Sequence, residues 1–119
     1  MEKENKERLE VSSVYADLGY KNHAEMETKA NLVMEISEEI KRKKLTQSQG
    51  AEMLGISQPK LSELLNGRFR GYSVERLMHF LNVLGKDVDI VVKDRPSSRS
   101  ARVSVCHFKR TRTRRAISV

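Results

Sequence analysis

Hydrophobic residues in the middle of the chain recur at helical spacing in four successive segments. Within residues 23–44 they return at steps of three and four, which places them on one face of a helix. Residues 46–55, 57–67 and 73–85 repeat this pattern over shorter lengths. The apolar positions are Met26, Ala30, Val33, Ile36, Ile40, Ala51, Leu54, Leu61, Leu64, Leu65, Val74, Leu77, Met78, Leu81 and Leu84. The pattern predicts four helices that share one core.

The predicted helices are bounded by residues that favour helix ends. Thr46, Ser57 and Ser73 stand just before the second, third and fourth segments, where a hydroxyl can accept a hydrogen bond from a first-turn N–H group. Gly55 and Gly85 follow the second and fourth segments, and glycine readily takes the left-handed conformation that ends a helix. We therefore expect short helices separated by tight turns.

Residues 87–93 follow a different pattern. Val88, Ile90 and Val92 alternate with polar residues, which is typical of a half-buried strand. A strand needs a partner, and the other β-leaning segment is residues 11–16, from the same chain or from a second copy. The fold class that we expect is mainly helical with a short C-terminal strand.

Charge is distributed unevenly along the chain. The formal net charge is +7, yet residues 95–119 alone carry eight basic residues and no acidic one, while residues 41–71 form a locally basic segment of net charge +5. We divide the chain into an N-terminal arm with a possible short strand, residues 1–22, a folded domain, residues 23–94, and a basic tail. The composition of the tail predicts disorder.

The composition excludes several classes of protein. Cys106 is the single cysteine, so no internal disulfide can form, and no apolar run approaches the roughly 18 residues that span a bilayer. With a charged N-terminus that does not resemble a signal peptide, we expect a cytoplasmic protein without membrane contact. His23, His79 and His107 are widely separated, and neither a catalytic triad nor a glycine-rich phosphate loop is present. We expect no metal, no cofactor and no enzymatic activity.

The most informative stretch is residues 46–68, with the sequence TQSQGAEMLGISQPKLSELLNGR. Two short predicted helices with Gly55 between them meet the geometric demand of a helix-turn-helix. Each helix is too short to be stable alone, so the two must pack together and onto their neighbours. Ala51 provides a small side chain where the helices cross, and Ile56 fills the space beneath the turn.

The second of these helices leaves a polar face outward. Glutamine can pair with adenine, lysine can reach guanine or a phosphate, and glutamate can accept from cytosine or repel phosphate and so restrict the register. Residues beside the helix are candidates for contacts to the DNA backbone. The candidate DNA-binding residues are Gln47, Ser57, Gln58, Lys60, Ser62, Glu63, Asn66, Arg68 and Arg70. The alternative is that Ser57 and Gln58 are a helix cap and its solvated neighbour, and that Glu63 is an ordinary surface residue.

The segment resembles the helix-turn-helix of the Cro/C1 or Xre family of repressors. The residues that carry the resemblance are Leu45, Thr46, Gln47, Ala51, Leu54, Gly55, Ile56, Ser57, Gln58, Leu61, Ser62, Leu64, Leu65, Asn66, Gly67 and Arg68. The resemblance covers about residues 28–84 and implies a lambda-repressor-like bundle of four to five helices. It also implies a homodimer on palindromic duplex DNA, with Gln47, Gln58 and residues 60–63 facing the DNA.

Two further features resemble a subgroup of this family, the HigA-type antitoxins. These are the strand at residues 87–93 in place of a fifth helix, and residues 13–19 before the first helix. The subgroup resemblance implies a RelE-like toxin as partner.

Three functions are therefore compatible with the sequence. The leading hypothesis is a sequence-specific transcriptional regulator that acts as a repressor. The alternative is an antitoxin that neutralises a toxin and regulates its own operon. The third is non-specific binding of nucleic acid, RNA included, through the basic tail.

Overall fold

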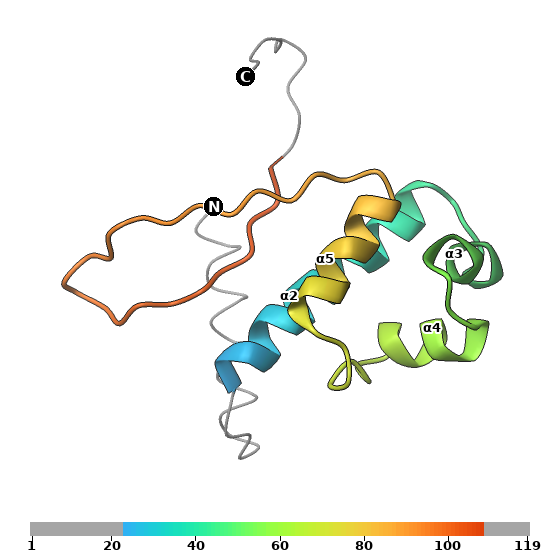
Figure 1. Ribbon diagram of the computed structural model, residues 1–119, viewed down its shortest axis with the longest axis horizontal. Coiled ribbons are helices and arrows are strands. Elements are labelled where there is room, and N and C mark those ends of the chain that lie inside the picture. The colour runs from blue at the N-terminus through green and yellow to red at the C-terminus, as the bar shows by residue number, and fades with distance from the viewer. Residues whose placement is uncertain (1–22, 109–119) are drawn as a thin grey trace, which may run out of the picture.

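The computed structural model describes residues 23–108. This part of the chain holds four helices, α2 (His23–Arg42), α3 (Gln47–Leu54), α4 (Gln58–Leu65) and α5 (Val74–Val83). The helix α2 packs along α5, and α3 packs against α4 (Figure 1). Contacts of α4 with α2, and of α3 with α5, join the two pairs into one bundle. The helical bundle predicted from the hydrophobic pattern is confirmed.

The core lies where the apolar faces of the four helices meet. The largest side chains with almost no exposure are aliphatic, apart from one asparagine: Ile36, Leu61, Leu64, Leu77, Leu84 and Asn31. Each fully buried aliphatic side chain contributes about 1.5–3 kcal/mol through the hydrophobic effect. Because α3 and α4 have only eight residues each, this shared core, and not their own length, stabilises them.

Local sequence determines where the helices begin and end. The Thr46 hydroxyl accepts a hydrogen bond from the backbone of Gln49 at 3.0 Å, and the Gln49 side chain accepts one from the Thr46 backbone at 2.8 Å. This reciprocal pair is a capping box. Ser57 and Ser73 cap α4 and α5, and Gly55 is left-handed with a φ of 73°. The predicted caps and the predicted turn are confirmed.

The long helix α2 buries polar as well as apolar side chains. Lys29, Asn31 and Glu39 are all buried, on a helix that also carries the apolar stripe of the core. Within residues 23–108, no helix has both the length and the apolar character needed to cross a membrane.

The strand predicted at residues 87–93 is not formed in the described part of the chain. After α5 the backbone runs outward as an irregular segment (Figure 1), and residues 87–93 make no backbone hydrogen bond to any other described residue. Ile90 and Val92 are largely exposed. An alternating pattern becomes a strand only beside another strand, and no other segment of residues 23–108 pairs with this one. Residues 11–16, the expected partner, lie outside the described residues.

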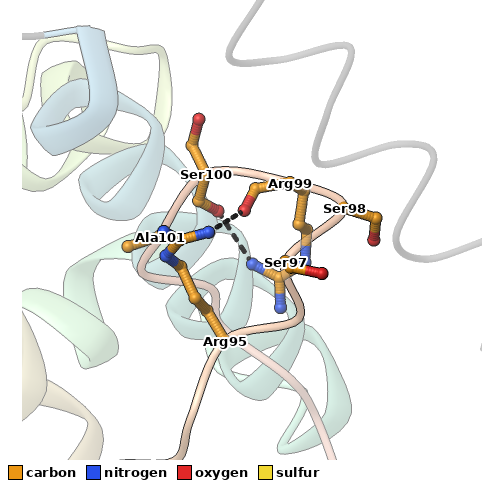
Figure 2. Close-up of a pocket in the computed structure, with 6 residues that line it drawn as sticks. All are labelled: Arg95, Ser97, Ser98, Arg99, Ser100 and Ala101. Carbon is orange, nitrogen blue, oxygen red and sulfur yellow. Dashed lines mark hydrogen bonds between the residues drawn. The ribbon is translucent and has the colours of Figure 1, made fainter.

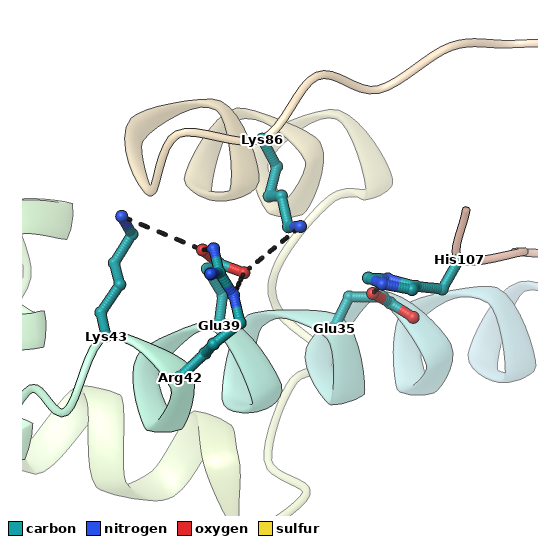
Figure 3. Close-up of polar contacts among 6 residues, drawn as sticks. All are labelled: Glu35, Glu39, Arg42, Lys43, Lys86 and His107. Carbon is teal, nitrogen blue, oxygen red and sulfur yellow. Dashed lines mark hydrogen bonds and ion pairs between the residues drawn. The ribbon is translucent and has the colours of Figure 1, made fainter. Parts of the chain in front are cut away.

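The chain then turns and comes back to α2. Residues 101–108 have no helix or strand, but Val105 packs against the core, and His107 Nδ1 lies 2.8 Å from Glu35 Oε1 (Figure 3). The end of the described chain is therefore attached to α2. The domain boundary near residue 94 stays a prediction, and residues 109–119 lie outside the described part.

Candidate nucleic-acid interface

The turn between α3 and α4 consists of three residues. Gly55 takes the left-handed conformation that ends α3, and the Ile56 N–H donates to the Ala51 carbonyl at 3.1 Å. Ile56 is half-buried against the core, as expected from the sequence, and Ser57 begins α4. The two helices are thus held in the arrangement of a helix-turn-helix.

The closest approach in this motif is at Gly50. A Cβ atom added to Gly50 would lie 3.2 Å from Leu61 Cδ2 and 3.4 Å from Ile40 Cδ1. Ala51, which the sequence indicated for this role, is also buried, but a methyl group at Gly50 would be in tighter contact than is usual for a Cβ atom. The sequence feature that could have indicated this close contact is the glycine itself. Glycine inside a helix costs about 1 kcal/mol of stability relative to alanine, so its presence there usually has a packing reason.

The helix α4 has a buried face and a polar face. Leu61 and Leu64 are completely buried, whereas the opposite side consists of side chains that can form hydrogen bonds. Ser57, Gln58, Lys60 and Glu63 are exposed, Ser62 is half-buried, and Gln47 is exposed at the start of α3. This polar face is the surface that the helix-turn-helix presents to solvent.

Ser57 already has a structural role in this surface. Its hydroxyl oxygen accepts the Lys60 N–H at 3.3 Å, as a helix cap does. A serine hydroxyl is also a donor, so the hydrogen of the same group can still be given to a ligand. The two interpretations of Ser57, cap and contact residue, are therefore compatible.

The loop after α4 carries the other candidate residues. Asn66 turns back on the helix, where its Nδ2 donates to the Ser62 carbonyl at 2.8 Å. Arg68 and Arg70 are exposed, and between them Phe69 is buried in the core with 3% of its surface accessible. The hydrophobic pattern of the predicted helices did not include Phe69, so its burial was not predicted. The position of this aromatic residue between two arginines in the sequence is the feature that could have indicated that Phe69 anchors the loop.

A lysine on α2 forms a second attachment for the loop. The Nζ atom of Lys29 donates to the Arg70 carbonyl at 3.1 Å and lies 3.3 Å from a carboxylate oxygen of Glu25. Beyond the loop, Tyr72 packs edge-on against Phe80, and the guanidinium of Arg76 lies 5.0 Å from the centre of the Tyr72 ring. The loop with Arg68 and Arg70 is therefore held on both sides.

Four basic residues follow one another at the end of α2, Lys41, Arg42, Lys43 and Lys44, and two of them form ion pairs within the protein. Glu39 is buried with only 3% of its side chain exposed, and it pairs with Arg42, with Lys43 at 3.9 Å and with Lys86 at 3.5 Å (Figure 3). Burial alone raises the pKa of Glu39, but the Arg42 hydrogen bond and the charges of Lys86 and Arg42 outweigh it, so the pKa is below its ordinary 4.5. This cluster connects the end of α2 to Lys86, three positions beyond the end of α5.

A second basic region lies in the loop formed by residues 95–101. Figure 2 shows the Arg95 guanidinium folded over this loop, where it donates to the Arg99 carbonyl at 2.8 Å, and Arg99 donates to the Ser100 carbonyl at 2.9 Å. The loop is far from α3 and α4 (Figure 1). Its arginines are thus not part of the surface formed by α4.

Metal-binding side chains do not gather anywhere in residues 23–108. No group of three or more His, Cys, Asp or Glu residues in this part of the chain is arranged to hold an ion. Cys106 is exposed.

Comparisons with known proteins agree with this arrangement. A family model described as a helix-turn-helix domain matches residues 14–93, which include all four described helices. Among solved structures, a chain described as an XRE-family transcriptional regulator superimposes with a TM-score of 0.67. Its sequence is 45% identical, and the match covers 71% of this chain and 97% of the other. The comparison with curated proteins gives no match.

Proposed function

Because this chain belongs to the helix-turn-helix family, we propose that it is a DNA-binding transcriptional regulator that recognises a specific duplex sequence through the polar face of α4. The observation that carries the proposal is the division of α4 into a buried leucine face and an exposed face of hydrogen-bonding side chains. A helix with its side chains is about 10–12 Å in diameter, and the major groove is about 12 Å wide, so a helix such as α4 fits into it.

The polar face of α4 offers several distinct contacts to base edges. Gln58 is suited to adenine, which presents one donor and one acceptor in the major groove. Lys60 is suited to guanine or to a phosphate, and Glu63 to the amino group of cytosine. Ser57 and Ser62 can hydrogen-bond to either a base or a phosphate.

The residues beside α4 are suited to the DNA backbone. Gln47 lies at the N-terminus of α3, where the helix dipole favours an anion. Arg68 and Arg70 project from the loop that follows α4, and Asn66 stands at its beginning. Contacts of this kind fix the position of the protein on the duplex without reading its sequence.

A homodimer is part of the proposal. Two copies reading two half-sites give the specificity that one short helix lacks. Two observations on residues 87–93 support a dimer. The apolar side chains of Ile90 and Val92 are exposed, and the backbone of this segment forms no backbone hydrogen bond within the described residues. The same segment of a second copy is able to supply the missing strand partner. Light scattering of the full chain at micromolar concentration tests this, and a monomer contradicts it.

The antitoxin alternative has less support. Of its two features, residues 13–19 lie outside the described part of the chain, and residues 87–93 form no strand there. The helix-turn-helix family model and the similar solved structure are described as a DNA-binding motif and a transcriptional regulator, so we propose the regulator alone.

Selection from random duplex DNA tests the proposed function. The purified full chain is expected to enrich one sequence, and the operator obtained in this way should then bind more tightly than scrambled DNA in a fluorescence anisotropy titration. Specific binding of DNA is typically 10³–10⁷ times tighter than non-specific binding. Equal affinity for the selected and the scrambled duplex would contradict the proposal and favour non-specific binding through the basic residues after position 94.

A further inference from the structure

Lys29 is a buried cation whose hydrogen bond reaches the candidate DNA surface. Its side chain is only 8% exposed, and its Nζ donates to the Arg70 carbonyl at 3.1 Å across 41 residues of sequence. Nζ also pairs with the carboxylate of Glu25, one helical turn earlier on α2. The lysine thus connects α2 to the backbone of the loop after α4.

The burial of Lys29 makes this hydrogen bond hard to replace. Removing an ammonium group from water is costly unless charged or hydrogen-bonded partners compensate for it. At 8% exposure water has little access to this side chain, so the Arg70 carbonyl and the Glu25 carboxylate provide most of the polar contacts of the ammonium group. The position of the Arg70 carbonyl is therefore strongly determined.

The loop is held at two successive residues. Phe69 inserts its ring into the core, and the carbonyl of the next residue, Arg70, accepts from Lys29. The Arg68 backbone N–H donates to the Glu63 carbonyl at 2.9 Å, which attaches the first part of the loop to α4. The backbone from which both arginine side chains project is thereby fixed relative to α4.

We propose that Lys29 is a positioning residue for DNA binding, which holds Arg68 and Arg70 in register with the phosphates beside the groove that α4 reads. This inference rests on the proposed function. The physical basis is preorganisation: an arginine on a fixed backbone loses less freedom when it contacts a phosphate than one on a mobile loop. Lys29 itself makes no contact with DNA in this proposal, because its ammonium group is directed into the protein.

The salt dependence of operator binding distinguishes positioning from plain stability. The logarithm of the affinity falls with the logarithm of the salt concentration by about 0.9 for each phosphate contact. We expect Lys29→Met to weaken binding to the selected operator about tenfold and to reduce this slope by about one contact. Lys29→Arg keeps a donor at the end of a long side chain and should restore most of both.

Lys86→Met is the matched control. Lys86 also pairs with a carboxylate, 3.5 Å from Glu39, and its side chain is 30% exposed, but it lies beyond α5 and does not touch the loop. Its substitution should change the melting temperature while leaving both operator affinity and salt slope at the wild-type values.

Combined substitutions test whether Lys29 acts on DNA binding through Arg68 and Arg70. Once Arg68 and Arg70 are both replaced by glutamine, adding Lys29→Met should cause little further loss of affinity, because residues that act through one another are non-additive. Full additivity, or an unchanged salt slope in folded Lys29→Met, overturns the inference. If Lys29→Met does not fold, Lys29→Gln, whose shorter side chain does not reach the carbonyl, is measured in the same way. A wild-type chain that enriches no sequence overturns the proposed function and this inference together.

Discussion

The carboxylate of Glu39 lies 3.5 Å from the ammonium group of Lys86, so the end of α2 is paired with the residue that follows α5 by three positions. Arg42 and Lys43 pair with the same carboxylate (Figure 3). Because the α2–α5 pair supports the helix-turn-helix, this cluster stabilises the scaffold of the proposed DNA surface.

The Glu39 cluster predicts a loss of stability in acid. The pKa of Glu39 is lowered in the folded protein, so its interactions stabilise the fold above the ordinary pKa of 4.5 and are lost as the pH falls through the lower folded-state value. Urea unfolding between about pH 3 and pH 6 measures this. Glu39→Gln should lower the free energy of unfolding at neutral pH by about 1–3 kcal/mol and flatten the acid limb. Glu38→Gln, on an exposed neighbour, should leave that limb unchanged.

Gly50→Ala is expected to destabilise the protein. The added methyl group would lie 3.2 Å from Leu61 Cδ2 and 3.4 Å from Ile40 Cδ1, so these two buried side chains would have to shift to accommodate it. Overpacking costs about 1–3 kcal/mol, which exceeds the gain of roughly 1 kcal/mol from placing alanine in a helix. Thermal unfolding should show a lower melting temperature. Gly71→Ala is the control, since a Cβ there meets nothing within 4 Å, and its melting temperature should stay near that of the wild type.

Asn31→Leu is expected to stabilise the protein. The side chain of Asn31 is almost completely buried, and neither its Oδ1 nor its Nδ2 has a hydrogen-bond partner among the described residues. An unsatisfied buried polar group costs about 1–3 kcal/mol, and leucine has the same branched arrangement of side-chain heavy atoms, although a larger volume, without that cost. Chemical denaturation should show a higher midpoint. Asn82→Leu should not do so, because the Asn82 Nδ2 donates to the Lys86 carbonyl at 2.9 Å; a lower midpoint for Asn31→Leu would show that the amide has a favourable role.

Gln58→Ala is expected to weaken operator binding by about 1–3 kcal/mol and to relax the preference at one base pair. The reason is the loss of a bidentate contact to a base edge. Anisotropy titrations against the operator and its single-base variants measure both effects. His79→Ala, on the exposed side of α5, serves as the control and should bind like the wild type.

Lys60→Ala separates two contacts that a lysine can make. If Lys60 contacts a phosphate, the substitution weakens all duplexes alike and lowers the salt slope by about one contact. If it contacts guanine, the loss is about 1–3 kcal/mol at one base pair alone. Intact operator affinity in both Gln58→Ala and Lys60→Ala would exclude α4 as the reading helix.

The basic loop at residues 95–101 should contribute charge without specificity. Replacing Arg95 and Arg99 by glutamine should lower the affinity for every duplex and reduce the salt slope, while the ranking of sequences is retained. Substitution is preferable to deletion of the C-terminal region, because Val105 and His107 contact the folded part. A ranking that disappears in this variant would mean that the loop, and not α4, discriminates between sequences.

Much of the helix-turn-helix was predictable because its signals are local. Thr46, Ser57 and Ser73 cap helices through hydrogen bonds to residues three positions later, and Gly55 takes its conformation with no atom near the position of a Cβ. Such preferences depend on the backbone immediately around each residue, so they can be recognised without a tertiary structure.

The strand predicted at residues 87–93 is not confirmed in the described part of the chain, because strand formation is not local. Alternation of Val88, Ile90 and Val92 specifies a surface that fits a sheet, but the hydrogen bonds must come from another segment. The alternating pattern of residues 87–93 does not specify whether the pairing segment lies close enough to form these hydrogen bonds.

The sequence by itself therefore determined the four helices, their ends and the outward polar face of α4, since these follow from periodicity and capping. Only the tertiary structure decided which polar residues of α2 are buried and what they hold. Lys29 contacts the Arg70 carbonyl, and Glu39 contacts Lys86. The partners in each contact are far apart in the sequence, so no local pattern predicts them. The same lysine on an exposed helix face would be an ordinary solvated charge; the packing of the loop against α2 makes it a support for the proposed DNA surface.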